Sequence, residues 1–221
     1  MKFKYLFFLI PLLFSSCIEI IDDLTLNADG SGTLKFTVNL SSSKIKVNSI
    51  LALDSLDGQR VPKLSEIEAK IGQFKSLLLQ QDGISNVKTE FNAVDLIVKL
   101  TVDFKSLNQL QEGIQASLNA MNLNKRVSKE DVQWMSWEGG TLKRTMPEIF
   151  QQELKRYENN DISLLKGGSY ACISRLPGQI LKTSNNNCKI NPSKTAAMLR
   201  INTFDLKNEP SILEHTLSTS P

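Results

Sequence analysis

The sequence predicts an α+β fold: an antiparallel sheet built from hairpins, with about three helices packed on one face. Apolar and polar residues alternate over residues 34–40 and 96–104, which is typical of half-buried strands. Glycine turns at residues 30–32 and 139–140 connect neighbouring stretches of this kind. A Ser or Thr followed three residues later by an acidic or amide side chain indicates the start of a helix. Such starts occur at Ser65, Ser106 and Thr145.

The first 16 residues have the layout of a secretory signal peptide. Lys2 and Lys4 supply positive charge, residues 5–14 form an apolar run, and Ser15 and Ser16 are small. The apolar run is too short to span a bilayer as a helix. We therefore predict that residues 1–16 are a signal peptide that is removed on export.

Cys17 follows directly and resembles the modified cysteine in the lipobox of bacterial lipoproteins. The resemblance implies that its sulfur receives a diacylglycerol and its new amine a fatty acid such as palmitate, so that the chain is anchored to a membrane. Phe14 stands where that family usually has leucine. In some bacteria an aspartate directly after the cysteine can act as a retention signal. This chain has Ile18 at that place, which favours the outer membrane. Two alternatives stay open: an unmodified residue after a conventional cleavage site, and a buried N-terminal strand.

A single domain is predicted over residues 17–206. It begins with a hairpin over residues 18–40, whose turn at residues 27–32 is rich in Asn, Asp and Gly. Residues 41–64 are largely polar and predict a loop or a short helix. The first clear helix then begins at Ser65 and ends before an Asp-Gly pair.

The middle of the domain continues this alternation of hairpins and helices. Strands over residues 84–91 and 96–104 precede a helix over 106–121, and a hairpin over 132–142 follows. A third helix begins at Thr145. Its apolar side comprises Ile149, Phe150, Leu154 and Tyr157.

The last third of the chain returns to strands, at about residues 169–174, 179–183 and 195–203. Asn-rich turns separate these strands. Residues 207–221 are polar and contain two prolines, so we expect a frayed tail there.

Charge argues against nucleic acid as a partner. Without Lys2 and Lys4, the chain has 24 basic and 23 acidic side chains, and therefore almost no net charge. No dense run of Lys and Arg is present to follow a phosphate backbone.

No catalytic, metal or cofactor site is predicted. His215 is the only histidine and lies in the expected tail, whereas a Ser-His-Asp or Cys-His arrangement needs an imidazole held beside its nucleophile. Gly30 and Gly32 lie between two strands, whereas a phosphate-binding loop needs a helix start. A calcium loop at this turn would need a glutamate where Phe36 stands.

Cys172 and Cys188 form an even pair in a chain that we expect to be exported, which favours a disulfide between them. The alternative is two buried free thiols. A zinc site is not expected, because no histidine lies nearby to complete a tetrahedral set of ligands.

Trp134 and Trp137 are candidate binding contacts. They are three residues apart, so on a strand their side chains point to opposite faces. One is expected in the core, and the other can contact a sugar, a lipid or a protein. Packing of both rings in the core is the alternative.

Two stretches of the chain resemble LppM-like lipoprotein domains. The first runs from Cys17 through the Leu-Thr-Leu-Asn-Ala-Asp-Gly-Ser-Gly-Thr-Leu segment at 24–34, and the second from 176–180 into an Asn-rich turn. The resemblance implies an envelope protein without established catalytic residues. A short acidic cluster is also similar to the surface-export signals of Bacteroidetes-type lipoproteins. It consists of Glu19, Asp22 and Asp23.

The function predicted from these observations is that of a non-enzymatic, lipid-anchored envelope protein that contacts another envelope component. Two alternatives belong to other classes. The first is a binder of a lipid or glycan in a groove between sheet and helices. The second is a polysaccharide hydrolase that uses two carboxylates about 5–9 Å apart.

Overall fold

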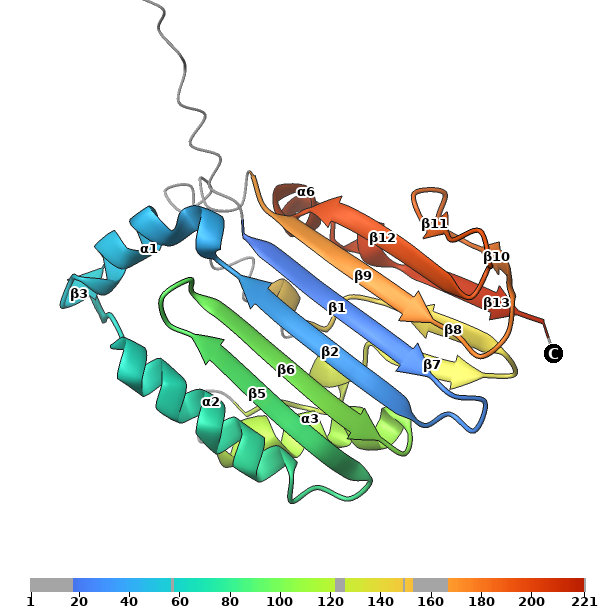
Figure 1. The fold of residues 1–221 in the computed structure, drawn as a ribbon, viewed down its shortest axis with the longest axis horizontal. Coiled ribbons are helices and arrows are strands. Elements are labelled where there is room, and N and C mark those ends of the chain that lie inside the picture. The colour runs from blue at the N-terminus through green and yellow to red at the C-terminus, as the bar shows by residue number, and fades with distance from the viewer. Residues whose placement is uncertain (1–17, 57, 122–125, 149, 153–166, 221) are drawn as a thin grey trace, which may run out of the picture.

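A computed structural model of the protein describes residues 18–56, 58–121, 126–148, 150–152 and 167–220 (Figure 1). The expected signal peptide and Cys17 lie outside the described residues, so cleavage and lipidation stay predictions. Three side chains of the expected third helix, namely Ile149, Leu154 and Tyr157, lie outside them as well.

Seven strands form the main sheet, in the order β11-β12-β9-β1-β2-β6-β5 (Figure 1). They are β1 Glu19–Leu26, β2 Gly32–Asn39, β5 Ile84–Asn92, β6 Ile97–Phe104, β9 Ser169–Arg175, β11 Lys189–Ile190 and β12 Ala196–Asn202. The first hairpin and the strands on either side of residue 94 therefore form as their alternating patterns predict.

A second sheet has four strands, in the order β10-β13-β8-β7. They are β7 Met135–Glu138, β8 Thr141–Arg144, β10 Ile180–Thr183 and β13 His215–Thr219. Gly139 and Gly140 form the β7–β8 turn with φ angles of 53° and 73°, which glycine adopts without strain. A small separate hairpin consists of β3 Ser55–Leu56 and β4 Gln59–Arg60.

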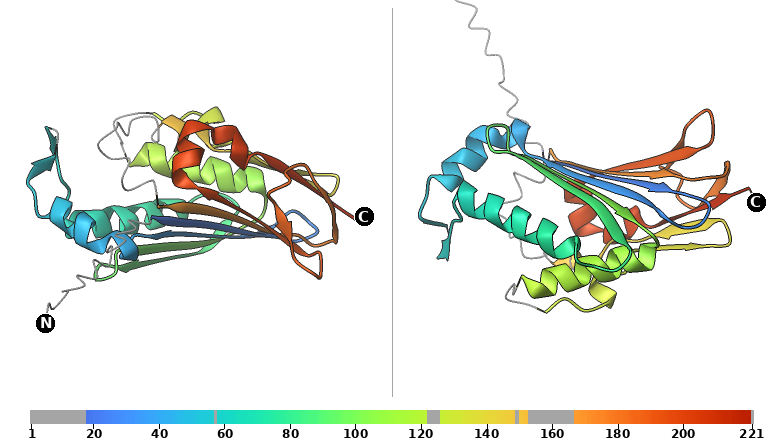
Figure 2. Two further views of the ribbon diagram at one scale, coloured as in Figure 1. Left: turned by 90° about the horizontal axis from the view of Figure 1, so that it is seen from above. Right: turned by 60° about the horizontal axis from the view of Figure 1, so that its bottom comes forward.

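The helices complete the fold. The α-helices are α1 Lys44–Leu51, α2 Leu64–Leu78, α3 Leu107–Ala120 and α6 Thr203–Asn208, and residues 148 and 150–152 are also helical. The 3-10 helices are η1 Ser41–Ser43, η2 Glu130–Val132 and η3 Pro210–Leu213. Figure 2 shows α3 and α6 on one face of the main sheet, and α2 beside its β5 edge. This combination of helices and mainly antiparallel strands confirms the α+β class.

The main sheet is mixed, whereas the sequence predicted an antiparallel sheet of hairpins. β1 pairs antiparallel with β2 but parallel with β9, and Asp22 lies opposite Cys172 in that register. The two parallel strands are far apart in the chain, so no local turn signal indicates their pairing.

Two helix starts can be compared with their predicted caps. At α3 the Ser106 hydroxyl accepts a hydrogen bond from the backbone N–H of Gln109 at 3.2 Å, as predicted. α2 begins one residue before Ser65, because Glu66 rather than Glu68 makes the capping contact. Its Oε2 accepts from the backbone N–H of Lys63 at 2.9 Å.

The C-terminal segment is ordered structure, so the expectation of a frayed tail was wrong. β13 pairs with both β8 and β10, and it therefore lies inside the second sheet. His215 and Leu217 alternate with polar residues and are 4% and 0% exposed. This short alternation, which the surrounding polar residues obscure in the sequence, is what buries the segment.

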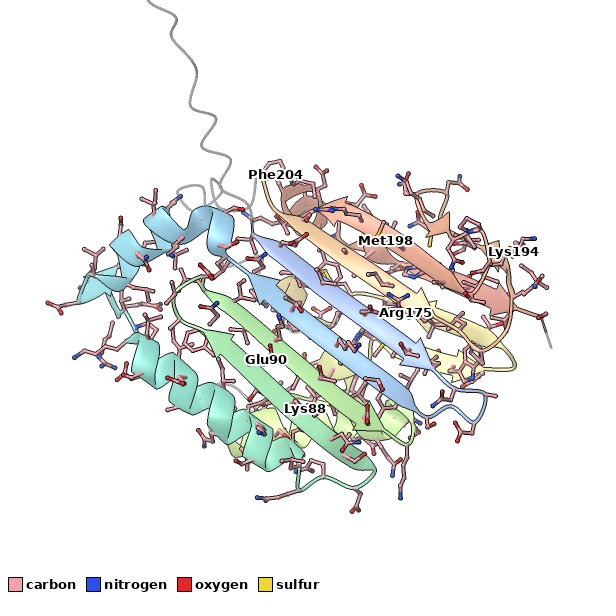
Figure 3. All side chains as sticks on the ribbon, viewed as in Figure 1. Lys88, Glu90, Arg175, Lys194, Met198 and Phe204 are labelled. Carbon is pink, nitrogen blue, oxygen red and sulfur yellow. The ribbon has the colours of Figure 1, made fainter. Side chains whose placement is uncertain are left out.

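The two faces of the main sheet differ in polarity. Charged side chains such as Lys88, Glu90 and Arg175 lie on the face that points towards the viewer in Figure 3. The opposite face is apolar and buried, with Leu24 and Val102 both fully inaccessible to solvent. The interior of the protein therefore lies between this face, α3 and the second sheet.

We predict that Gly32→Ala destabilises the fold, because a Cβ at this position would collide with the backbone oxygen of Thr25 and lie 2.8 Å from Cζ of Phe104. Overpacking of this kind costs about 1–3 kcal/mol. Gly72→Ala is the matched control, because nothing lies within 4 Å of its Cβ and alanine favours helix by about 1 kcal/mol. Urea unfolding should show a lower midpoint for the first variant and an unchanged or higher midpoint for the second. Equal midpoints would contradict this packing.

Candidate functional site

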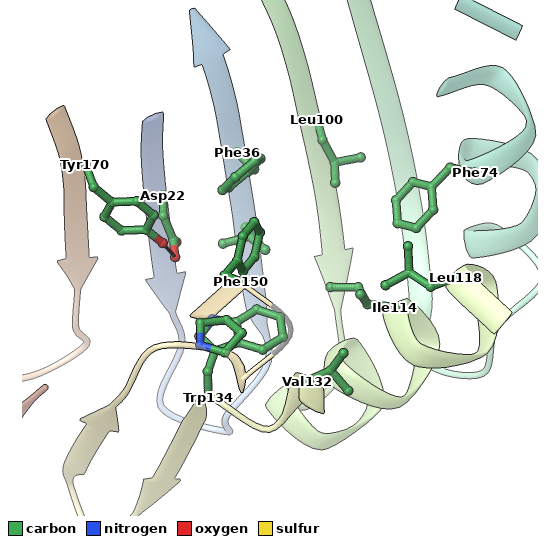
Figure 4. A pocket seen from close by; sticks show the side chains of 12 residues that line it. Asp22, Phe36, Phe74, Leu100, Ile114, Leu118, Val132, Trp134, Phe150 and Tyr170 are labelled. Atoms are coloured by element: carbon green, nitrogen blue, oxygen red, sulfur yellow. Dashed lines mark hydrogen bonds between the residues drawn. The ribbon is translucent and has the colours of Figure 1, made fainter. Parts of the chain in front are cut away.

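An apolar cavity of about 350 Å³ lies between the buried face of the main sheet and the helices (Figure 4). This volume is at the lower end of the range for small-molecule sites, about 300–1,000 Å³. The cavity is lined by Asp22, Leu34, Phe36, Phe74, Leu100, Ile114, Leu118, Val132, Trp134, Pro147, Phe150 and Tyr170. Asp22 is the one charged residue in this set.

The periodicities of strand and helix explain how these side chains meet. Leu34 and Phe36 lie two residues apart on β2 and therefore point to the same face of the sheet. Ile114 and Leu118 lie four residues apart on α3 and share one face of that helix. Phe150 closes the group, with its ring centroid 6.4 Å from that of Phe36.

A second hollow, of about 380 Å³, continues from the cavity towards α2. The two share Phe36, Phe74, Leu100 and Leu118 in their walls, so they form one apolar groove. Lys70 and Lys99 line the second hollow. The ammonium group of Lys99 pairs with Glu90 at 3.4 Å on the polar face of the sheet, so of the two lysines Lys70 is the one that can supply positive charge at this end of the groove, and Asp22 lines its other end.

A buried ion pair borders the cavity. Arg144 on β8 and Asp22 on β1 have side chains that are 2% and 4% exposed, and Nη2 of Arg144 lies 2.5 Å from Oδ2 of Asp22. The Tyr170 hydroxyl donates a second hydrogen bond to Oδ2 at 3.0 Å. Nη1 of Arg144 donates to the backbone oxygen of Ile173 at 3.2 Å and to the Ser174 hydroxyl at 3.1 Å.

The other oxygen of Asp22 has no such contact. Oδ1 of Asp22 is buried and, within the described part of the chain, accepts no hydrogen bond. Figure 4 shows the carboxyl group beside Tyr170 at the cavity wall. A buried polar atom without a partner is uncommon and costs free energy, so it requires an explanation.

The ionisable groups around this pair are uncharged near neutral pH. Burial raises the pKa of Cys172 to about 12 and that of Tyr170 well above its usual range. Burial also lowers the pKa of His215. Burial alone would lower the pKa of Arg144, but the Asp22 carboxylate raises it above its ordinary value. Arg144 is therefore a cation, and it faces the Asp22 carboxylate in the ion pair.

The structure separates the two tryptophans that the sequence singled out. Trp134 lines the cavity, whereas Trp137 packs against the core. The Trp137 ring lies beside the first hairpin turn, since a Cβ added to Gly30 would be 3.8 Å from Cδ1 of Trp137. Gln111 fixes the segment that carries Trp134: its Oε1 accepts from the backbone N–H groups of Trp134 and Met135 at 2.8 and 2.9 Å. Its Nε2 donates to the Met135 oxygen at 3.1 Å.

The expected disulfide between Cys172 and Cys188 is absent: both residues are free cysteines. They are 2% and 8% exposed and belong to the hydrophobic core. Each thiol packs there as a small apolar side chain, which is the alternative that the sequence left open.

The acidic residues near the N-terminus have structural partners. Asp22 is buried against Arg144, Asp23 pairs with Arg175 at 3.0 Å, and Glu19 lies 3.4 Å from Arg200. Of the three, Asp22 is not available at the surface as an export signal would require. Sequence reasoning missed Arg144 altogether, although its place two residues after Leu142 puts it on the buried face of β8.

The described residues contain neither a metal-binding cluster nor a membrane-spanning helix. No group of three or more His, Cys, Asp and Glu side chains in those segments could hold a metal ion. No helix among them is long and apolar enough to cross a membrane.

The fold and site define an α+β protein with an apolar cavity beside a buried ion pair. No protein-family model and no curated protein matches the chain. Among solved structures, it is similar to the NMR structure of the folded domain of LppM from Mycobacterium tuberculosis. The match has a TM-score of 0.41 and 11% sequence identity, and it covers 92% of this chain and 91% of that one. A match at this level carries no argument about function. The lipobox and the Bacteroidetes-type assignment therefore stay predictions.

We predict that Arg144→Met destabilises the protein by about 3–5 kcal/mol, because it leaves the Asp22 carboxylate buried without its cation. The double variant Asp22→Leu/Arg144→Met removes both charges and should regain most of that loss. Chemical denaturation of the two variants and the wild type gives the free energies of unfolding to be compared. A double variant as unstable as Arg144→Met would show that the pair is not what the single change disrupts.

Proposed function

We propose that this protein is a non-enzymatic, lipid-anchored protein of the bacterial envelope that holds an alkyl chain of a lipid in its cavity. The observation that carries the proposal is the cavity of about 350 Å³, whose lining is apolar except at Asp22 and Tyr170. Anchoring and envelope location rest on the lipobox-like segment that ends at Cys17. The envelope component predicted as a partner would then be the membrane or protein that supplies the lipid.

Wall chemistry favours a lipid over a glycan. A glycan presents many hydroxyl groups, and each one that is buried needs a hydrogen-bond partner. The cavity wall offers mainly Leu, Ile, Val, Phe and Pro side chains, which bind alkyl groups by excluding water. The continuation of the groove towards α2 adds length, which suits a chain more than a compact sugar.

A carboxylate-based hydrolase has less support. Such enzymes need two carboxyl groups that face one scissile bond. Asp22 is the one carboxylate among the described residues that line the cavity, and Arg144 and Tyr170 engage one of its oxygens.

We expect a decane that carries a diazirine to label the cavity when the full-length protein, extracted from membranes and held in amphipol, is irradiated. Peptide mapping by mass spectrometry should find the label on β2 and α3, and an excess of decanol should remove it. Leu118→Trp fills space in the groove, so the alkyl probe should bury about two methylenes fewer. At ~0.8 kcal/mol for each methylene, we expect labelling to weaken about tenfold.

Leu79→Trp is the control for that change. Leu79 is 46% exposed just after α2, so a tryptophan there leaves the cavity unchanged and labelling should match the wild type. Labelling that no decyl compound displaces, or equal labelling of the two variants, would contradict binding in the cavity.

We predict that Cys17→Ser releases the protein from the membrane fraction. Serine cannot form the thioether, so no diacylglycerol is attached, and the several acyl chains that together give stable anchoring are lost. Intact mass spectrometry of the membrane-extracted wild type should show a chain that begins at Cys17 and carries added lipid mass. A mass equal to the bare polypeptide with residues 1–16 still attached would refute the anchor.

A further inference from the structure

We infer that the lipid in the cavity carries an uncharged O–H or N–H donor, and that this donor hydrogen-bonds to Oδ1 of Asp22. The inference rests on the proposed function, because it assigns the head group of the ligand whose alkyl chain the cavity holds. It makes Asp22 the residue that selects among lipids by head-group chemistry.

The unsatisfied oxygen supplies the first argument. Asp22 is 3% exposed, and Arg144 and Tyr170 both donate to its Oδ2. Oδ1 has no partner in the described chain and almost no accessible surface, but the residue lines an open cavity, so a small turn of the carboxyl group would bring this oxygen to a ligand there. A carboxylate oxygen is a strong acceptor, and a ligand donor placed here would remove the cost of leaving it unpaired.

Charge supplies the second argument. The ion pair of Asp22 and Arg144 is neutral as a unit, and among the described residues no other charged one lines the cavity. A ligand carboxylate or phosphate would face the Asp22 carboxylate and be repelled. An ammonium group would attract Asp22, but it would have to give up its hydration in an apolar cavity. A neutral hydroxyl or amide donor meets neither cost.

The position of the head group in the groove supplies the third argument, because it differs between the inferred ligand and an ordinary fatty acid. An anionic head could lie near Lys70, in the second hollow. Its alkyl end would then reach Asp22 and leave Oδ1 unpaired. The two orientations predict opposite orders of affinity for ligands that share one chain.

The test compares four decyl compounds as competitors of the diazirine-bearing decane on the same full-length protein in amphipol. Decanol and decanamide carry a neutral donor, methyl decanoate carries none, and decanoate is an anion. One hydrogen bond to a charged acceptor corresponds to about 10- to 100-fold in affinity. We expect decanol and decanamide to compete at concentrations lower by this factor than methyl decanoate and decanoate.

Each other outcome has a definite meaning. Equal competition by decanol and methyl decanoate overturns the inference while the alkyl site stands, and it indicates that a water molecule alone occupies Oδ1. Tightest competition by decanoate also overturns it, and places the head group near Lys70. If no compound displaces the alkyl label, the proposed function and the inference both fail.

Variants of Asp22 provide an independent check on the ratio of affinities. The double variant Asp22→Leu/Arg144→Met keeps the packing but removes the acceptor, so decanol should lose its advantage over methyl decanoate. Asp22→Asn offers an amide donor as well as an acceptor, which should improve methyl decanoate relative to decanol. If Asp22→Asn does not fold, the wild type and the double variant still decide the matter. An unchanged preference for decanol in the double variant would overturn the role of Asp22.

Discussion

The rest of the structure depends on the ion pair between Asp22 and Arg144. This pair joins the two sheets through their facing surfaces, which are otherwise mainly apolar. Asp22 interrupts the buried face of β1, and Arg144 does the same on β8. Neither charge is tolerable there alone, so the relative position of the sheets is restricted to arrangements that bring them together. The Tyr170 hydroxyl and the backbone of β9 complete the network.

The cavity follows from the same arrangement. The main sheet extends beyond the second sheet, and the helices cover that remaining part of its apolar face. Gln111 ties α3 to the segment that leads into β7, so one side chain positions both the helix and Trp134. The walls of the cavity thus come from the sheet, α3 and the segment that carries Trp134.

Local chemistry made part of this structure predictable. The hairpin of β1 and β2, the strands β5 and β6 and the capped start of α3 follow from alternation and capping within a few residues. The parallel pair of β1 and β9 and the contact of Asp22 with Arg144 join residues more than 120 positions apart, and no pattern in one sequence specifies such partners. For the same reason Trp134 could be named as a binding contact, whereas the cavity that it lines could not. His215 was placed in a tail because the strand it begins is short.

The place of β1 in the main sheet has a mechanical consequence. The strand lies between β2 and β9, with hydrogen bonds along both of its edges, and the chain enters it from residue 18. A pull on the segment before residue 18 acts along the strand axis, so it loads both rows of bonds at once in shear. A terminal strand at the border of a sheet would peel away one bond at a time. Tension at this end is therefore resisted by the middle of the fold.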